Sequence, residues 1–86
     1  MGVKQIPVSK FIAWLESIGL EYVRTKGSHD HYNYPKGDSR YLTRCITVRT
    51  KYKDIPLFHI HTNLQTLGIS KAEFEKQRKK FYGSLF

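Results

Sequence analysis

The feature that most constrains the fold is the dipeptide Gly27-Ser28, which interrupts two segments rich in strand-forming residues. Residues 20–26 and 29–34 flank this pair, so the break between them is a tight turn. Residues 35–39 have the turn chemistry of a second hairpin loop, and residues 40–48 predict a third strand. Short connections join antiparallel neighbours, and the sequence therefore predicts a three-stranded antiparallel meander.

A helix is predicted before this meander. Ser9 is the expected N-cap, and Gly19 supplies the left-handed turn that ends a helix. Trp14 is expected to be partly buried at the helix edge. The apolar stripe consists of Phe11, Ile12, Leu15 and Ile18.

Two further helices are predicted after the meander. The first begins near Pro56 and ends at Gly68, with an apolar stripe of Leu57, Ile60, Leu64 and Leu67. The second begins with the capping box Ser70-Lys71-Ala72-Glu73. Its expected inward residues are Phe74 and Phe81, and its expected outward residues are Lys76, Arg78, Lys79 and Lys80.

This order predicts one α+β domain over residues 1–86, because a chain of 86 residues is too short for two. The expected architecture is a two-layer α-β-β-β-α arrangement, in which helices cover one face of the antiparallel sheet. The other face is expected to be open to solvent or to a ligand.

The charge favours a polyanionic partner. Lysine and arginine number 15 against 7 acidic residues, a formal net charge of +8. Nucleic acid is the commonest such partner, and a basic surface without this role is the alternative.

Cys45 is the only cysteine, which fits a reducing compartment, and its place in an alternating apolar stretch predicts a small core residue. No apolar run has the length of a membrane span, and the N-terminus lacks the apolar core of a signal peptide, so we expect a cytoplasmic protein without a membrane partner.

The strand after the glycine-serine turn places its side chains on two faces. His29, His31 and Asn33 share one face, and the alternating residues Asp30, Tyr32 and Tyr34 share the other. If the tyrosines pack toward the helices, the two histidines lie on the open face.

Histidine on such a face suits phosphodiester chemistry, because its ordinary pKa of about 6.5 lets it take or give a proton near neutrality. RNA carries its own nucleophile, the 2′-hydroxyl, so cleavage requires no metal and we expect no cofactor. Arg24 and Lys26 would attract the phosphate, Gly27 would let it approach the backbone, and Ser28 would donate a hydrogen bond. The alternative is a histidine that is simply exposed on a strand.

Two other groups of residues have open interpretations. Lys51 and Lys53 flank a tyrosine, a combination that grips phosphates and stacks on bases, or that forms an ordinary solvated loop. His59 and His61 are expected on the solvated face of the second helix, whose N-terminal N–H groups are a potential phosphate site. A zinc site built from all four histidines is disfavoured, because residues two apart on a helix diverge.

The order of motifs resembles a known family. Phe11–Gly19 contains Trp14-Leu15-Glu16-Ser17-Ile18-Gly19, and after it come Arg24-Thr25-Lys26-Gly27-Ser28-His29 and an aromatic segment that ends at Pro35. Near the end stands Leu64-Gln65-Thr66-Leu67-Gly68-Ile69-Ser70-Lys71-Ala72-Glu73-Phe74. This order is similar to that of HicA-type mRNA interferase toxins, and the likeness covers residues 9–75. Those proteins carry a short helix ending in glycine, an R-x-x-G-S-H segment, and a late apolar helix closing as L-x-x-x-G-[IL]-S-x-x-E-F.

The resemblance implies a double-stranded-RNA-binding-domain-like fold and the activity of a type II toxin that cleaves mRNA through a strand histidine. It also implies a HicB-type antitoxin partner that covers the active site. His29 takes the histidine of the motif, and Gly27 and Ser28 shape its turn. Asp30 departs from the family, since many members have a second histidine there and in some it is the catalytic one. His29 and His31 therefore both remain candidates, and a non-catalytic RNA-binding module on the same fold is the alternative.

Overall fold

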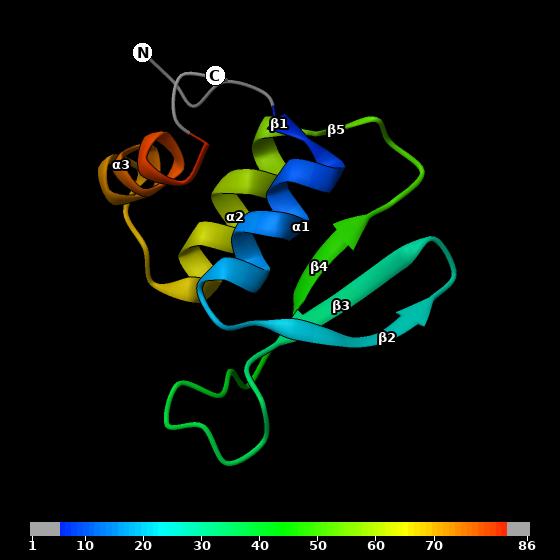
Figure 1. The fold of residues 1–86 in the computed structure, drawn as a ribbon. Coiled ribbons are helices and arrows are strands. Elements are labelled where there is room, and N and C mark those ends of the chain that lie inside the picture. Colours follow the sequence, from blue (N-terminus) through cyan, green and yellow to red (C-terminus); the bar gives the residue numbers. More distant parts are fainter. Residues whose placement is uncertain (1–5, 83–86) are drawn as a thin grey trace.

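The computed structural model describes the backbone of residues 6–82 and the side chains of residues 6–79 (Figure 1). Its elements in chain order are β1 (Ile6–Pro7), α1 (Val8–Ser17), β2 (Glu21–Lys26), β3 (His29–Asn33), β4 (Ile46–Arg49), β5 (Asp54–Ile55), α2 (Leu57–Leu67) and α3 (Lys71–Tyr82). Strands β2, β3 and β4 form an antiparallel sheet in that order. The predicted α+β fold with a three-stranded antiparallel sheet is confirmed.

The turn between β2 and β3 is the predicted two-residue turn. Gly27 has φ +64°, a backbone conformation that hairpin turns require and that side chains with a Cβ rarely adopt. The turn is also tied to the end of β4, because the Thr50 backbone N–H donates to the Ser28 carbonyl oxygen at 3.1 Å. The register that follows pairs Lys26 with His29 and Arg24 with His31.

The third strand is shorter than predicted, because β4 covers only the end of residues 40–48. Asn33 is 1% exposed, and its carboxamide bonds both backbone groups of Leu42 at 2.9 Å. A side chain thus satisfies backbone groups that a strand would have paired in a ladder. Cys45, which was predicted to lie in the core, is only half-buried.

A second, two-stranded ribbon was not predicted. β1 pairs with β5 in antiparallel register, and Ile6 and Ile55 are buried there. Helix α1 begins at Val8, directly after Pro7, and the Val8 N–H donates to the Lys53 carbonyl oxygen at 2.9 Å. The prediction of Ser9 as the N-cap is therefore wrong, and Ser9 lies inside the first turn.

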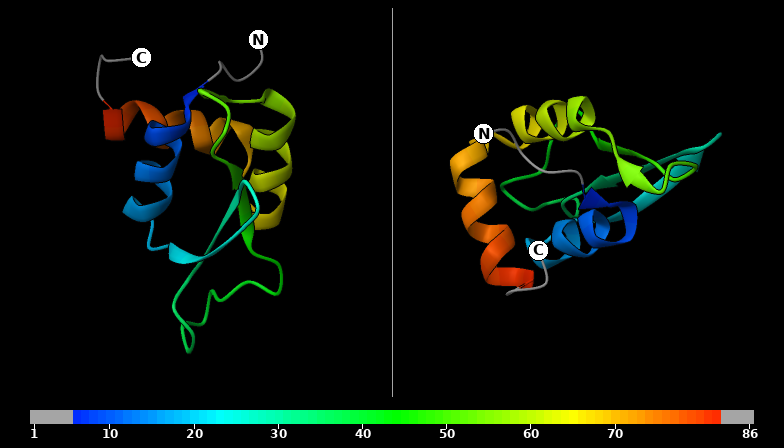
Figure 2. Two further views of the ribbon diagram at one scale, coloured as in Figure 1. Left: turned by 90° about the vertical axis from the view of Figure 1, so that its right-hand side faces the viewer. Right: turned by 90° about the horizontal axis from the view of Figure 1, so that it is seen from above.

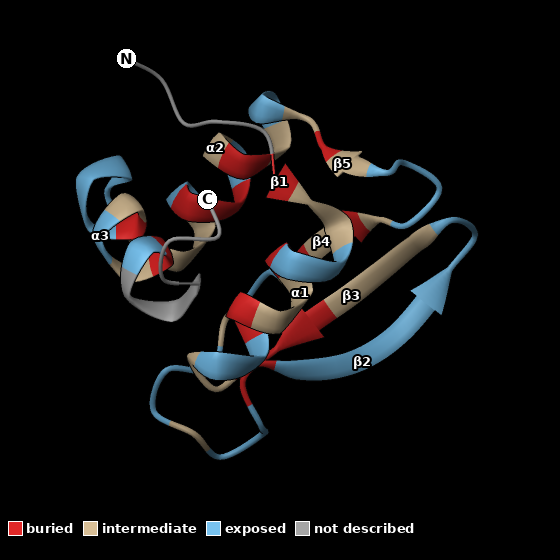
Figure 3. Ribbon diagram, turned by 45° about the horizontal axis from the view of Figure 1, so that its top comes forward, coloured by how far each residue is buried: buried red, intermediate tan, exposed pale blue. Residues whose placement is uncertain are grey.

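One core joins the helices to the sheet. The face of the sheet that carries Tyr32, Ile46 and Val48 packs against α1, and Ile60 and Leu64 bring α2 into the same cluster. Both views in Figure 2 place β4 between α1 and α2. Figure 3 shows that buried residues gather around this line, whereas β2 is exposed along its whole length.

The helices differ from prediction at three side chains. Trp14 is only 1% exposed, because its ring packs edge-on against Phe74 with centroids 4.7 Å apart. Leu57, predicted in an apolar stripe, is exposed in the first turn of α2. Arg78, predicted to face outward, is buried and pairs with Glu75 at 3.0 Å. The predictions for the side chains of Lys80 and Phe81 fall outside the described residues.

Candidate nucleic-acid-binding groove

The sheet carries a row of cations and histidines on the face opposite the core. Directly paired residues of antiparallel strands share a face, so the side chains of Arg24 and His31 are neighbours, as are those of Lys26 and His29. His29 also pairs with Arg49 of β4. Tyr32 is buried on the inner face, so the two histidines lie on the outer face, as the alternation predicted. Asn33, which was predicted to share that open face, is instead buried against Leu42.

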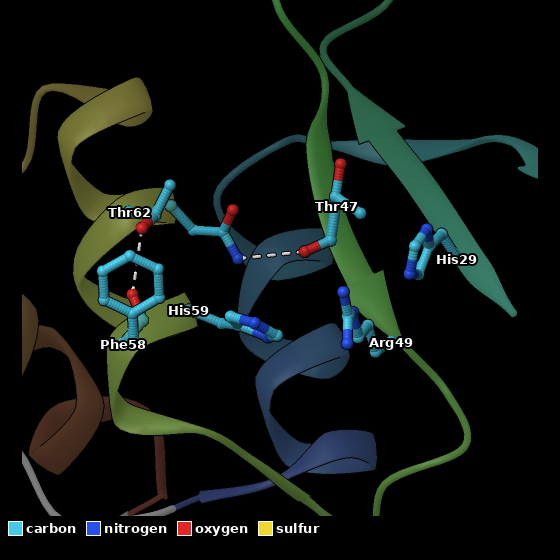
Figure 4. A pocket seen from close by; sticks show the side chains of 7 residues that line it. His29, Thr47, Arg49, Phe58, His59 and Thr62 are labelled. Carbon is cyan, nitrogen blue, oxygen red and sulfur yellow. Dashed lines mark hydrogen bonds between the residues drawn. The ribbon is translucent and has the colours of Figure 1, made fainter.

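Helix α2 forms a wall beside this face. The space between them is a groove of about 200 Å³ lined by His29, Thr47, Arg49, Phe58, His59, Thr62 and Asn63. Asn63 is 5% exposed, and its Nδ2 donates to the Thr47 carbonyl oxygen at 3.1 Å. This bond fixes α2 to the free edge of β4 beside the groove (Figure 4).

Two histidines reach the groove from opposite sides. In Figure 4 the His59 ring points from α2 toward the Arg49 guanidinium, and the His29 ring lies on the far side of Arg49. Burial, followed by the charges of Arg49 and His29, lowers the pKa of His59. A ring in this setting favours the neutral form, which accepts a proton.

His31 lies next to the groove but not in its lining. Its Nδ1 is 3.4 Å from Thr47 Oγ1. Burial lowers its pKa, and the charges of Arg24, His29 and Lys26 act in the same direction, whereas Asp30 raises it. Of the two predicted catalytic histidines, His29 is thus the one that the structure brings into the groove.

Some of the predicted RNA-binding residues lie close to the histidines and the groove, and others lie outside them. Arg24 and Lys26 are exposed on the outer face beside the two strand histidines. Lys51 Nζ and the Arg49 guanidinium carbon lie 5.7 and 6.0 Å from the centroid of the Tyr52 ring, which links the basic loop to the groove. The exposed Lys53 side chain is not part of the lining, nor are Gly27 and Ser28, which form the turn at its end.

Sequence reasoning missed His59 as a groove residue and did not name Arg49 as a candidate site residue. The structure makes Arg49 the last residue of β4, and it turns His59 inward rather than to solvent. A signal was present, because His59, Thr62 and Asn63 follow the i, i+3, i+4 spacing of one helix face.

Comparison with protein-family models, with curated proteins and with solved structures found no match for this chain. Among the described residues, no helix is long and apolar enough to cross a membrane. The described part of the chain also holds no group of three or more histidine, cysteine and acidic side chains placed to bind a metal ion.

Proposed function

We propose that this protein is a HicA-like endoribonuclease toxin that cleaves mRNA in the groove between β4 and α2 without a metal cofactor. The observation that carries the proposal is the position of His29, which lies in a lined groove beside the Arg49 guanidinium. In this proposal His29 transfers a proton and Arg49 binds the scissile phosphate.

Electrostatics support a phosphate in this groove. Arg49 is one of the lining residues, and Lys26 and Arg24 lie on the same face of the sheet, on β2. A guanidinium binds a phosphate through two N–H donors and stabilises the charge that grows on its oxygens during reaction. The formal net charge of +8 adds a long-range attraction for RNA.

An exposed aromatic ring favours an unpaired strand as substrate. Phe58 is 75% exposed although it lines the groove, so its ring is free to stack on a base. Tyr52, 38% exposed beside Arg49 and Lys51, offers a second ring. Stacking requires a base that is not already paired, so single-stranded mRNA is the substrate we propose.

The partner in this proposal is a HicB-type antitoxin. An antitoxin that covers the outer face would block His29 and neutralise the cations around it. We propose the cytoplasm as the site of action, because mRNA is found there.

The experiment is cleavage of a single-stranded RNA by the purified chain in excess chelator. We expect fragments with 2′,3′-cyclic phosphate and 5′-hydroxyl ends, and no cleavage of a DNA strand of the same sequence. The His29→Ala variant should lose activity and should no longer arrest growth when expressed without an antitoxin. His31→Ala should have the smaller effect, because its ring lies outside the groove lining.

Unfolding curves of each variant provide the control, since His29 and His31 are only half-buried and their loss should leave the fold intact. Equal cleavage by wild type and the His29→Ala, His31→Ala double variant would contradict the proposal. RNA that is bound in a salt-dependent manner but stays intact would identify a non-catalytic RNA-binding module instead.

A further inference from the structure

Cleavage of RNA through its 2′-hydroxyl involves two proton transfers. His29 can carry out one of them, and the other requires a second titratable group. A proton must leave O2′ as this oxygen attacks phosphorus, and another must reach O5′ as the P–O5′ bond breaks. The described part of the groove holds one other side chain with an ordinary pKa near neutrality, the His59 imidazole of α2.

We propose that His59 is the general base of this groove and that His29 is its general acid. This inference rests on the proposed ribonuclease function and assigns it a second catalytic residue. In Figure 4 the two rings lie on either side of Arg49, so a phosphate bound to this guanidinium would lie between the two imidazoles.

The step balances without a co-reactant. His59 takes the 2′-hydroxyl proton, O2′ forms a bond to phosphorus, and the P–O5′ bond breaks. His29 gives its proton to the departing O5′, which becomes a 5′-hydroxyl. The products are a 2′,3′-cyclic phosphate and the 5′-hydroxyl fragment, and the two histidines exchange protonation states before the next turnover.

The assignment of base and acid follows from the surroundings of His59. The charged and titratable groups that face it are Arg49 of β4 and His29 of β3, and both act with burial to lower its pKa. A lowered pKa favours the neutral form of His59, which is the form that a general base requires. The remaining role, donation of a proton to O5′, falls to His29, the other imidazole in the described lining.

Two substrates separate the roles. One is a ribodinucleotide, whose leaving O5′ needs a proton, and the other is uridine 3′-(4-nitrophenyl phosphate), whose leaving group departs without one. We expect His59→Asn to lower kcat/KM for both substrates by roughly 10²- to 10⁴-fold, the usual contribution of one general acid or base. His29→Asn should lose the dinucleotide reaction to a similar extent and keep most of the nitrophenyl reaction. His61→Asn, two residues along α2 and outside the groove lining, is the matched control and should behave as wild type.

A pH profile provides a readout that a purely structural role would not move. Arg49→Gln removes a charge that lowers the pKa of His59, so the acidic limb of kcat/KM should shift to higher pH. An acidic limb that stays at the wild-type pH in Arg49→Gln would overturn the assignment. A His59→Asn variant that has a wild-type kcat/KM on the nitrophenyl substrate and a lowered one on the dinucleotide would overturn it as well. Wild-type rates in His59→Asn on both substrates would refute the inference alone, whereas an inert wild type would refute the proposed function with it.

Discussion

The attachment of α2 to β4 through Asn63 leads to a prediction that links stability to the geometry of the groove. Asn63→Ala removes the 3.1 Å hydrogen bond to the Thr47 carbonyl oxygen and leaves that oxygen without this donor in a partly buried place. Loss of such a bond costs about 1–3 kcal/mol, and the lower part of this range applies because burial is partial. Alanine has a higher helix propensity than asparagine, which offsets up to about 0.7 kcal/mol of this loss. We therefore expect the free energy of unfolding to fall by roughly 1 kcal/mol.

The assay is urea unfolding of the full chain, with thermal unfolding as a second measurement. In a domain of this size a loss of 1 kcal/mol lowers Tm by about 4–8 °C. Gln65→Ala is the matched control, because Gln65 is exposed on the same helix, and changes at such sites usually stay within about 0.5 kcal/mol. Equal free energies of unfolding for the two variants would refute the view that Asn63 fixes α2 to the sheet edge.

Further predictions concern the rim of the groove, the turn between β2 and β3, the loop that joins β3 to β4, and Asp30. Phe58→Ala should weaken binding of single-stranded RNA by about 1–3 kcal/mol in a filter or fluorescence titration and leave the unfolding midpoint unchanged, because the ring is mostly exposed. Gly27→Ala should lower the free energy of unfolding by about 1–2 kcal/mol, since φ is +64° there and an added Cβ meets no other atom, so backbone strain alone acts. The hydrogen bonds and charge of Arg40 lower the pKa of Asp38 from 3.8 to about 2. The contribution of Asp38 to the free energy of unfolding is therefore present above pH 3.8 and is lost as the pH falls toward 2. Asp38→Asn should reduce this part of the pH dependence when unfolding is measured across the acid range. Asp30→Asn should leave the rate of RNA cleavage within about threefold of wild type, a factor worth under 1 kcal/mol.

The β2–β3 hairpin, the end of α2 and the start of α3 were predictable because their signals are local. Gly27-Ser28 defines a hairpin by itself, and Gly68, with φ +75°, ends α2 where the sequence predicted. Ser70 Oγ likewise accepts the Glu73 N–H at 3.1 Å, as the capping box predicted. In each case the residues that determine the structure lie within four positions of one another.

The groove was not predictable in the same way, because it depends on contacts between distant segments. His29 meets Arg49 only through the register of β3 and β4, and α2 reaches them only through the bond from Asn63 to Thr47. The carboxamide of Asn33 similarly binds Leu42 across nine positions and shortens the third strand. Local spacing places His59, Thr62 and Asn63 on one helix face, but it does not identify the strand that this face meets.

The alternation of β3 also bears on Asp30, where the sequence departs from the HicA pattern. Asp30 Oδ1 accepts a hydrogen bond from Thr25 Oγ1 at 2.6 Å, and Thr25 in turn contacts the Tyr22 hydroxyl, so the carboxylate belongs to the same face as Tyr32. Because adjacent strand residues point to opposite faces, a histidine at position 30 would face away from Arg49. In this chain the side chain at position 29 is the one that reaches the groove, and the carboxylate at position 30 neither replaces a groove residue nor points its charge at a phosphate bound there.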